Sequence, residues 1–146
     1  MFLKGQVIYF SPFYFKNGNT SKNKYFIILS NKNNDVIIAT LPTRTHKAPA
    51  LIDIKHGCIN NEERCFNCYL FESGKVICIE GFSFDMNTYV YGNEVEDYKL
   101  ELLASVYGIE GVDYEILGQL LDKEFAALYD CIKNSKSIKN KIKRLL

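Results

Sequence analysis

The chain has 146 residues and a formal net charge of +1, and it is 47% hydrophobic, 14% aromatic and 24% charged. These values exclude a disordered chain and fit one domain with one core. No apolar run approaches the roughly 20 residues that a membrane-spanning helix needs. Because Met1–Lys4 leads into strand-like sequence without the apolar core of a signal peptide, we expect a cytoplasmic protein that does not contact a membrane.

The charges are segregated along the chain. Residues 1–47 carry seven Lys or Arg against one acid, Asp35, which gives a net charge of +6. Residues 80–124 carry eleven carboxylates against two lysines, a net charge of −9, and residues 133–144 carry six basic side chains and no acid. Clustered positive charge attracts polyanions such as nucleic acids. The same lysines would equally serve to solvate one face of the fold.

Short strands are predicted through the first part of the chain. Gln6–Phe10 is the first, and Lys24–Ser30 and Asp35–Leu41 form a hairpin signature, because apolar β-formers flank the Asn-rich turn Asn31–Asn34. Three further short strands are expected at Leu51–Ile54, Cys68–Phe71 and Lys75–Ile79. This spacing predicts a small antiparallel barrel or sandwich over residues 1–92.

Helical periodicity replaces the strand pattern in the last third, so we expect a helical closing segment over residues 96–146 of a single domain, 1–146. Asp97 is the predicted N-cap of a first helix and Asp122 that of a second helix, which reaches Ser135. The expected buried positions are Leu100, Leu103 and Val106 in the first helix and Phe125, Leu128, Tyr129 and Ile132 in the second. Isolated helices as short as the basic tail are marginal. We therefore expect the tail to be an accessory segment outside the core that docks on the acidic segment.

The residues limit the chemistry. The chain has no phosphate-binding Gly-rich loop, no paired metal-binding histidines and no nucleophilic Ser elbow, and its only histidines are His46 and His56. A reaction whose nucleophile belongs to the substrate fits such a residue set. Cleavage of RNA by its own 2′-hydroxyl is one, since it requires a proton acceptor and a group that stabilises the phosphorane, and no metal.

The five cysteines are expected to be reduced thiols, because their number is odd and no secretory signal precedes them. Cys58, Cys65, Cys68 and Cys78 follow a C-x6-C-x2-C-x9-C spacing that matches no standard zinc pattern. Cys65 and Cys68 also point to opposite faces if they enter a strand. We interpret the cysteines as small core residues rather than metal ligands, and we expect no metal or other cofactor.

Several segments resemble the PemK/MazF toxins, the endoribonucleases of toxin–antitoxin pairs. Lys4–Phe10, Asn23–Ser30 and Val36–Thr43 look like the opening of that family, and Val76–Gly81 and Leu121–Ser135 are similar to its last barrel strand and final helix. The resemblance implies a mainly β fold with C-terminal helices, built as a small antiparallel SH3-like barrel. It also implies a homodimer, an antitoxin partner, and metal-independent cleavage of single-stranded RNA that leaves a 2′,3′-cyclic phosphate and a 5′-hydroxyl.

Carried onto this sequence, the family's catalytic arginine falls on Lys24 and its catalytic threonine on Thr43. The first is a departure, because lysine offers a phosphate a mobile point charge where arginine offers a planar fork. Antiparallel pairing across the Asn31–Asn34 turn would make the two residues neighbours. The alternative interpretation is that Lys24 is a solvated lysine at a strand start and Thr43 a turn residue.

Four further residues are predicted to bind RNA: Lys22, Arg44, His46 and Tyr14. His46 lies three residues beyond Thr43, where an imidazole would be an acid or base, although a lone loop histidine is more often inert. Tyr14 would stack on a base. The alternative function is a non-catalytic SH3-like barrel that binds RNA or a protein partner through the same basic surface.

Overall fold

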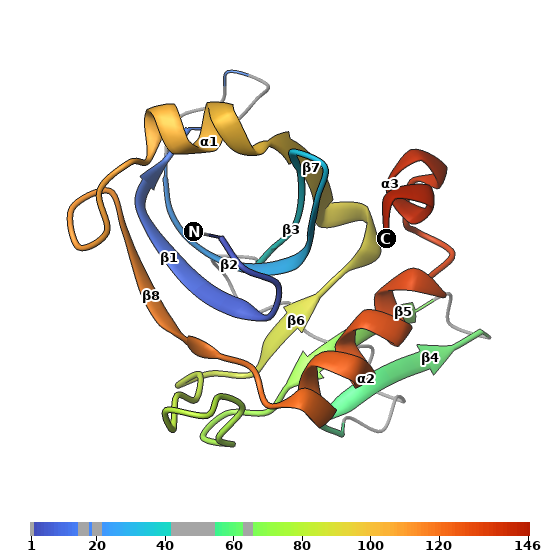
Figure 1. The fold of residues 1–146 in the computed structure, drawn as a ribbon. Coiled ribbons are helices and arrows are strands. Elements are labelled where there is room, and N and C mark those ends of the chain that lie inside the picture. Colours follow the sequence, from blue (N-terminus) through green and yellow to red (C-terminus); the bar gives the residue numbers. More distant parts are fainter. Residues whose placement is uncertain (1, 15–17, 19–21, 42–54, 63–65) are drawn as a thin grey trace.

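The structure, a computed structural model, describes residues 2–14, 18, 22–41, 55–62 and 66–146. Its larger sheet has five antiparallel strands in the order β7-β3-β2-β1-β8. The bounds of these strands are β1 (Gln6–Phe13), β2 (Lys22–Lys32), β3 (Asp35–Thr40), β7 (Val95–Lys99) and β8 (Tyr114–Gln119). Figure 1 shows the sheet curling, with helix α1 (Leu100–Val106) lying across one end of the curl between β7 and β8. Among the described residues, no helix combines the length and apolar character that crossing a bilayer requires.

The predicted hairpin is confirmed, and its strands are β2 and β3. Lys32 pairs with Asp35, so only Asn33 and Asn34 make the turn, with φ of 50° and 67°. Such a two-residue turn matches the right-handed twist of the flanking strands, and asparagine tolerates positive φ better than most residues. The register then sets Phe26 opposite Thr40, which brings the start of β2 beside the end of β3.

The helical closing segment expected over residues 96–146 is confirmed only in part, because it contains helices but also the strands β7 and β8. Asp97 lies in β7 opposite Ile37 of β3, and β8 pairs with β1 through Ile8 and Ile116. Asp97 therefore does not cap α1. The residue at the N-cap is Lys99, whose ammonium pairs with Asp35 at 2.6 Å. The mainly β fold with C-terminal helices is confirmed, while the described strands form a curled open sheet in which β7 and β8 are the edges.

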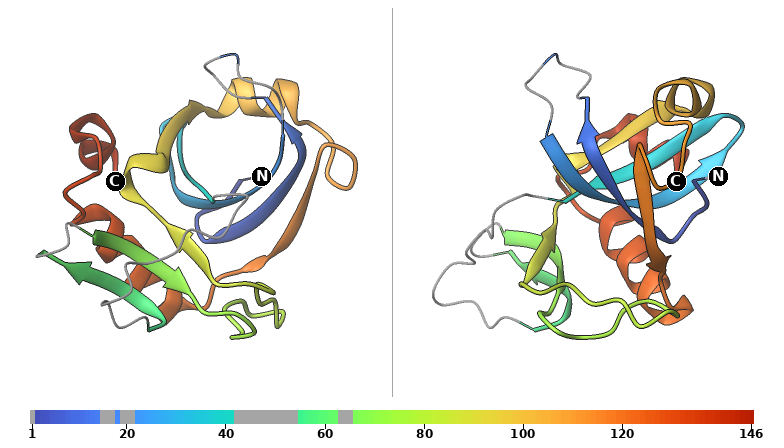
Figure 2. Two further views of the ribbon diagram at one scale, coloured as in Figure 1. Left: turned by 180° about the vertical axis from the view of Figure 1, so that it is seen from behind. Right: turned by 90° about the vertical axis from the view of Figure 1, so that its left-hand side faces the viewer.

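A smaller sheet forms a second layer. Its strands are β4 (Gly57–Asn61), β5 (Phe66–Phe71) and β6 (Thr88–Val90), in that order, and β6 leads through the short helix η1 (Gly92–Glu94) into β7. Helix α2 (Asp122–Lys133) lies along this sheet (Figure 1, Figure 2).

Of the strands predicted in this part of the chain, only one is confirmed. Cys68–Phe71 falls within β5, but Lys75–Ile79 is not a strand, because Cys78 makes only an isolated bridge to Leu120. Leu51–Ile54 lies outside the described residues.

Three apolar clusters form among the described residues, and the two larger ones hold the layers. The main one joins the two sheets to α2 and includes Ile27, Phe71 and Leu128, each no more than 1% exposed. The other lies inside the curl and contains Phe10 and Leu103 of α1. The predicted buried stripe of the second helix is confirmed in part: α2 buries Leu128 and Ile132, and Cys131 with them, and its N-cap is Leu121 rather than Asp122.

The basic tail belongs to the core, so its expected place outside the core is wrong. Ile138 and Ile142, the latter in α3 (Asn140–Leu145), are 7% and 1% exposed within the main cluster. The predicted docking on the acidic segment is confirmed, since Lys139 pairs with Glu96 at 2.6 Å and Lys141 with Asp97 at 3.3 Å. A helix too short to be stable alone is thus stabilised by packing and charge against β7.

Candidate functional site

The predicted site residues that the structure describes lie at one end of the larger sheet. Phe13 pairs with Lys22 and Phe10 with Lys24, so the start of β2 lies beside the end of β1, which Tyr14 directly follows. The end of β3 lies on the other side of β2. Thr43, Arg44 and His46 lie outside the described residues, as does the side chain of Lys22.

Lys24 is the cation that the structure places at this end. Its side chain is half-buried, and Nζ donates a hydrogen bond to the carbonyl oxygen of Leu41 at 3.2 Å. Leu41 directly follows β3 and precedes Thr43 by two positions. The predicted pairing of the start of β2 with the end of β3 is therefore confirmed, and it holds a positive charge where the chain leaves β3.

Tyr14 lies beside the same strand end and offers an aromatic surface. Its side chain is 59% exposed, and its ring stacks on Tyr107 with centroids 6.3 Å apart and an interplanar angle of 21°. The backbone N–H of Tyr14 donates to Tyr107 Oη at 2.8 Å, which fixes the two residues together. Tyr107 stacks in turn on Phe13 at 5.2 Å, and burial raises its pKa, so the phenol is neutral. This arrangement can stack an unpaired base on an anchored ring.

A half-buried polar cluster, which we did not predict, joins the smaller sheet to α2. His56 Nε2 hydrogen-bonds the carboxylate of Glu124, and Tyr69 Oη donates to the same carboxylate oxygen at 2.9 Å. The backbone N–H of Glu72 donates to His56 Nδ1 at 3.0 Å, so the ring proton is on Nε2 and points to Glu124. Burial, then the neighbouring carboxylate, raises the pKa of Tyr69 well above its usual value.

Both ring nitrogens of His56 are engaged in hydrogen bonds. The cluster therefore positions α2 against the smaller sheet and is not an acid–base centre. A signal for it was present in the sequence. Glu124 precedes Leu128 by four residues and Cys131 by seven, so a carboxylate occupies the buried stripe of α2. A half-buried carboxylate requires partners, and the structure supplies them from a loop and a strand far away in the sequence.

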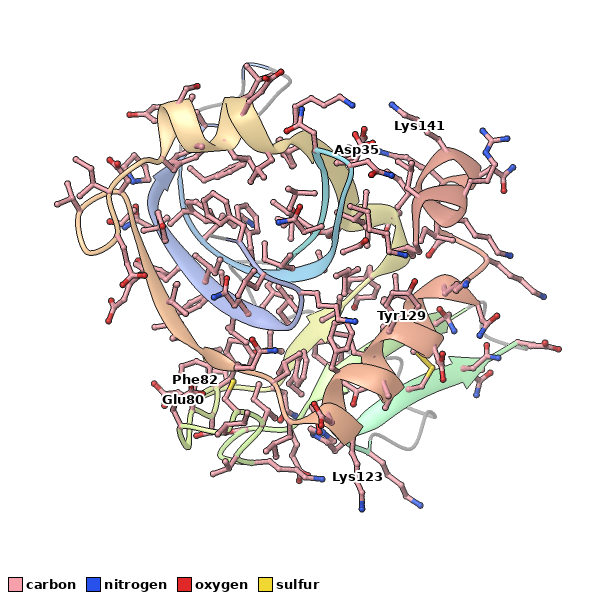
Figure 3. All side chains as sticks on the ribbon, viewed as in Figure 1. Asp35, Glu80, Phe82, Lys123, Tyr129 and Lys141 are labelled. Atoms are coloured by element: carbon pink, nitrogen blue, oxygen red, sulfur yellow. A yellow bond between two sulfur atoms is a disulfide. The ribbon has the colours of Figure 1, made fainter. Side chains whose placement is uncertain are left out.

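The cysteines differ from the expectation of five reduced thiols. Cys58 of β4 and Cys131 of α2 form a disulfide with their Cα atoms 5.6 Å apart, visible as the yellow bond in Figure 3. Sequence alone missed it because 73 residues separate the two positions and only the packing of α2 on β4 brings them together. Cys68 and Cys78 are free and buried, as predicted for core residues, and burial raises the pKa of each thiol to about 12. Within the described ranges, no three His, Cys, Asp or Glu side chains converge as metal ligands would.

Comparison of the chain with protein-family models, with curated proteins and with solved structures gave no match. The class that the structure itself defines is a mainly antiparallel β protein of two sheets with C-terminal helices. Its candidate site lies where β1 and β3 end and β2 begins.

Proposed function

We propose that the protein is a metal-independent endoribonuclease of the PemK/MazF type, acting on single-stranded RNA as the toxin of a toxin–antitoxin pair in the cytoplasm. One observation carries the proposal: the Lys24 ammonium lies 3.2 Å from the carbonyl oxygen of Leu41, beside the strand end that leads to Thr43. In this proposal the curled sheet functions as an SH3-like barrel, two copies form the active dimer, and an antitoxin protein blocks the basic surface.

The proposed reaction uses the RNA's own 2′-hydroxyl. Its oxygen attacks the adjacent phosphorus and gives its proton to solvent water. The bond from phosphorus to the 5′-oxygen breaks, and that oxygen takes a proton from water, which leaves a 2′,3′-cyclic phosphate and a 5′-hydroxyl. Lys24 would offset the charge that grows on the non-bridging oxygens, and the Thr43 hydroxyl would donate one hydrogen bond to them. Tyr14 would stack a neighbouring base, while Lys22, Arg44 and His46 would hold the RNA backbone.

The second candidate is a barrel of the same kind that binds RNA or a protein without cleaving anything. The lysine at position 24 favours it, because a point charge holds a phosphate without the planar two-point contact that arginine makes. Lys24→Arg therefore separates the two functions. In a nuclease this variant retains or gains activity, whereas in a binding protein it creates none.

The test is cleavage of single-stranded RNA by purified protein, with mapping of the new 5′ ends, alongside growth arrest on induced expression. Lys24→Ala and Thr43→Ala should each lower the cleavage rate by about 10² to 10³ without an appreciable change in melting temperature. The matched control is Lys32→Ala, an exposed lysine at the opposite end of β2, which should cleave at the wild-type rate.

Equal cleavage by wild type and both alanine variants would move the site elsewhere, with His46 the next residue to replace. Binding of RNA by the wild type with no cleavage under any condition would establish the second candidate instead.

A further inference from the structure

A row of three side chains crosses neighbouring strands of the larger sheet. The register places Tyr25 of β2 opposite Tyr9 of β1, and Tyr9 opposite Glu115 of β8. Opposite residues of antiparallel strands project from the same face of a sheet. Val7 and Ile27, two positions away along their strands, share this face and belong to the main cluster. The second layer covers the row only in part, since Tyr25 is 40% exposed and Glu115 is exposed as well.

The loop between β5 and β6 adds a fourth side chain, Asp85. Phe84 of this loop packs on Tyr25 with ring centroids 5.7 Å apart and an interplanar angle of 85°, and the exposed Asp85 directly follows it. The hydroxyl of Ser73 donates to the carbonyl oxygen of Asp85 at 2.7 Å, which holds this part of the loop in place. Burial raises the pKa of Tyr25, and the nearby carboxylates of Asp85 and Glu115 raise it further, so the phenol is neutral at neutral pH.

Tyr9, Tyr25, Asp85 and Glu115 together form what we call the tyrosine–carboxylate patch. Among the residues that the structure describes, no cation pairs with either carboxylate and no group hydrogen-bonds either phenol oxygen. Every one of these oxygens can accept a hydrogen bond, and two of the four groups are negatively charged. The patch therefore suits a cation that donates several hydrogen bonds, whereas its carboxylates would repel the phosphates of a nucleic acid.

We propose that the tyrosine–carboxylate patch docks an arginine side chain of a protein partner. A guanidinium carries five N–H donors in one plane, binds a carboxylate through two parallel hydrogen bonds and packs on aromatic rings, whereas the ammonium of lysine is a compact point charge. The patch lies on an open sheet face, where a free amino acid would stay largely solvated, so a protein must supply further contacts. Met86, next to Asp85 and 59% exposed, offers an apolar contact of this kind. The proposal does not depend on cleavage of RNA at Lys24.

The test is a titration of ¹⁵N-labelled protein followed by NMR, with short acetylated peptides in which glycine alternates with arginine, lysine or citrulline. Citrulline has nearly the shape of arginine but carries no charge. The expected result is saturable shifts of the backbone amides of the four patch residues with the arginine peptide, weaker shifts with the lysine peptide and none with the citrulline peptide. Free arginine should bind more weakly than the arginine peptide, because it lacks the contacts around the guanidinium.

Glu115→Gln and Asp85→Asn, both at exposed positions, should each weaken binding of the arginine peptide roughly threefold to tenfold, with no appreciable change in melting temperature. Glu101→Gln removes the same charge from an exposed position of α1 and is the matched control, which should bind like the wild type. Equal binding of the arginine and citrulline peptides, unchanged binding in both patch variants, or no saturable binding would overturn the proposal. So would binding of free arginine, spermidine or a single-stranded oligoadenylate to these residues at least as tightly as the arginine peptide, because the occupant would then be a small cation or RNA.

Discussion

The two sheets of the molecule are held in different ways. In the larger sheet, Phe10 lies in a cluster of aromatic rings, with the centroids of Phe26 and Tyr107 at 5.1 and 4.8 Å. The smaller sheet is fastened to α2 by one disulfide and one charged hydrogen-bonded cluster, those of Cys58 and of His56. Burial is divided among many contacts, whereas a covalent bond or a hydrogen bond to a carboxylate is lost in a single chemical event. The larger sheet should therefore respond to substitution in its core, and the smaller one to redox state and to single polar changes.

The largest expected effect is in the larger sheet. Phe10→Ala should lower the free energy of unfolding by about 3–5 kcal/mol, because it removes a fully buried ring from the aromatic cluster. Urea unfolding measures the change. Leu102→Ala, at a side chain that is 62% exposed on α1, is the control and should stay within about 0.5 kcal/mol of wild type. A loss below about 1 kcal/mol for Phe10→Ala would mean that this cluster does not dominate the stability of the sheet.

Loss of the Cys58–Cys131 bond should come next. Reduction, or Cys58→Ser, should cost about 2–4 kcal/mol, because the bond closes a long loop in the unfolded chain. Hydrogen exchange should speed up in β4, β5 and α2 and change little in β1 to β3. A reducing agent should not lower the stability of Cys58→Ser any further, because this variant has already lost the disulfide. The variant is therefore the control for the reduction experiment. Peptide mapping of protein kept under non-reducing conditions must find the two cysteines linked, or the comparison between the sheets fails.

The polar cluster gives a smaller effect. Glu124→Gln should lower the free energy of unfolding by about 1–3 kcal/mol, because it removes the charge that His56 and Tyr69 both face in a half-buried site. Asp130→Asn, an exposed acid on the same helix, is the matched control and should fall within about 0.5 kcal/mol of wild type. If the two variants are equally stable, the cluster contributes nothing beyond a surface pair.

The smallest effect is a dependence on alkaline pH. The Cys68 and Cys78 thiols have an ordinary pKa of 9.0, and burial raises it to about 12 in the folded chain. The unfolded chain therefore loses these protons first, so the stabilisation is complete below pH 9 and is lost as the pH rises toward 12. The urea midpoint should be lower at pH 9 than at pH 8, by the equivalent of under about 1 kcal/mol for the two thiols together, and Cys78→Ala should reduce the difference. A midpoint that rises over this range would contradict the assignment.

The parts of the fold that were predictable are those that depend on neighbours in the chain. The β2–β3 hairpin was predictable because its apolar runs and its Asn turn lie within about twenty residues, and α2 because its apolar stripe repeats at helical spacing. β7 and β8 were missed, since their partners are β3 and β1, some sixty or more residues earlier. Asp97 shows the error clearly: an acid before an apolar repeat resembles a helix cap, yet here it lies in an edge strand.

The candidate site likewise has a part that local sequence predicts and a part that depends on residues far apart in the chain. The juxtaposition of Lys24 with the end of β3 followed from hairpin register and is confirmed by the contact with Leu41. The pairing of His56 with Glu124 spans 68 positions, so the place of Glu124 in the apolar stripe of α2 indicates that it has a partner but not which residue the partner is. The basic tail was wrongly placed outside the core, because a helix as short as this one is unstable alone. In the structure its stability comes from its contacts with β7.

The Asn33–Asn34 turn has a consequence for how the chain folds as it is synthesised. The first two free N–H groups of α1 bond to Asn34, Leu100 N to its carbonyl oxygen at 2.9 Å and Glu101 N to its Oδ1 at 3.2 Å. A hairpin forms within microseconds, while a helix of seven residues has no lasting stability alone. Residues 22–40 leave the ribosome about sixty residues ahead of α1, which at 5–20 residues per second is roughly 3–12 s earlier. We therefore expect the nascent hairpin to act as the template on which α1 starts, so Asn34→Gly, which keeps the turn but removes the Oδ1 acceptor, should delay the helix without delaying the hairpin.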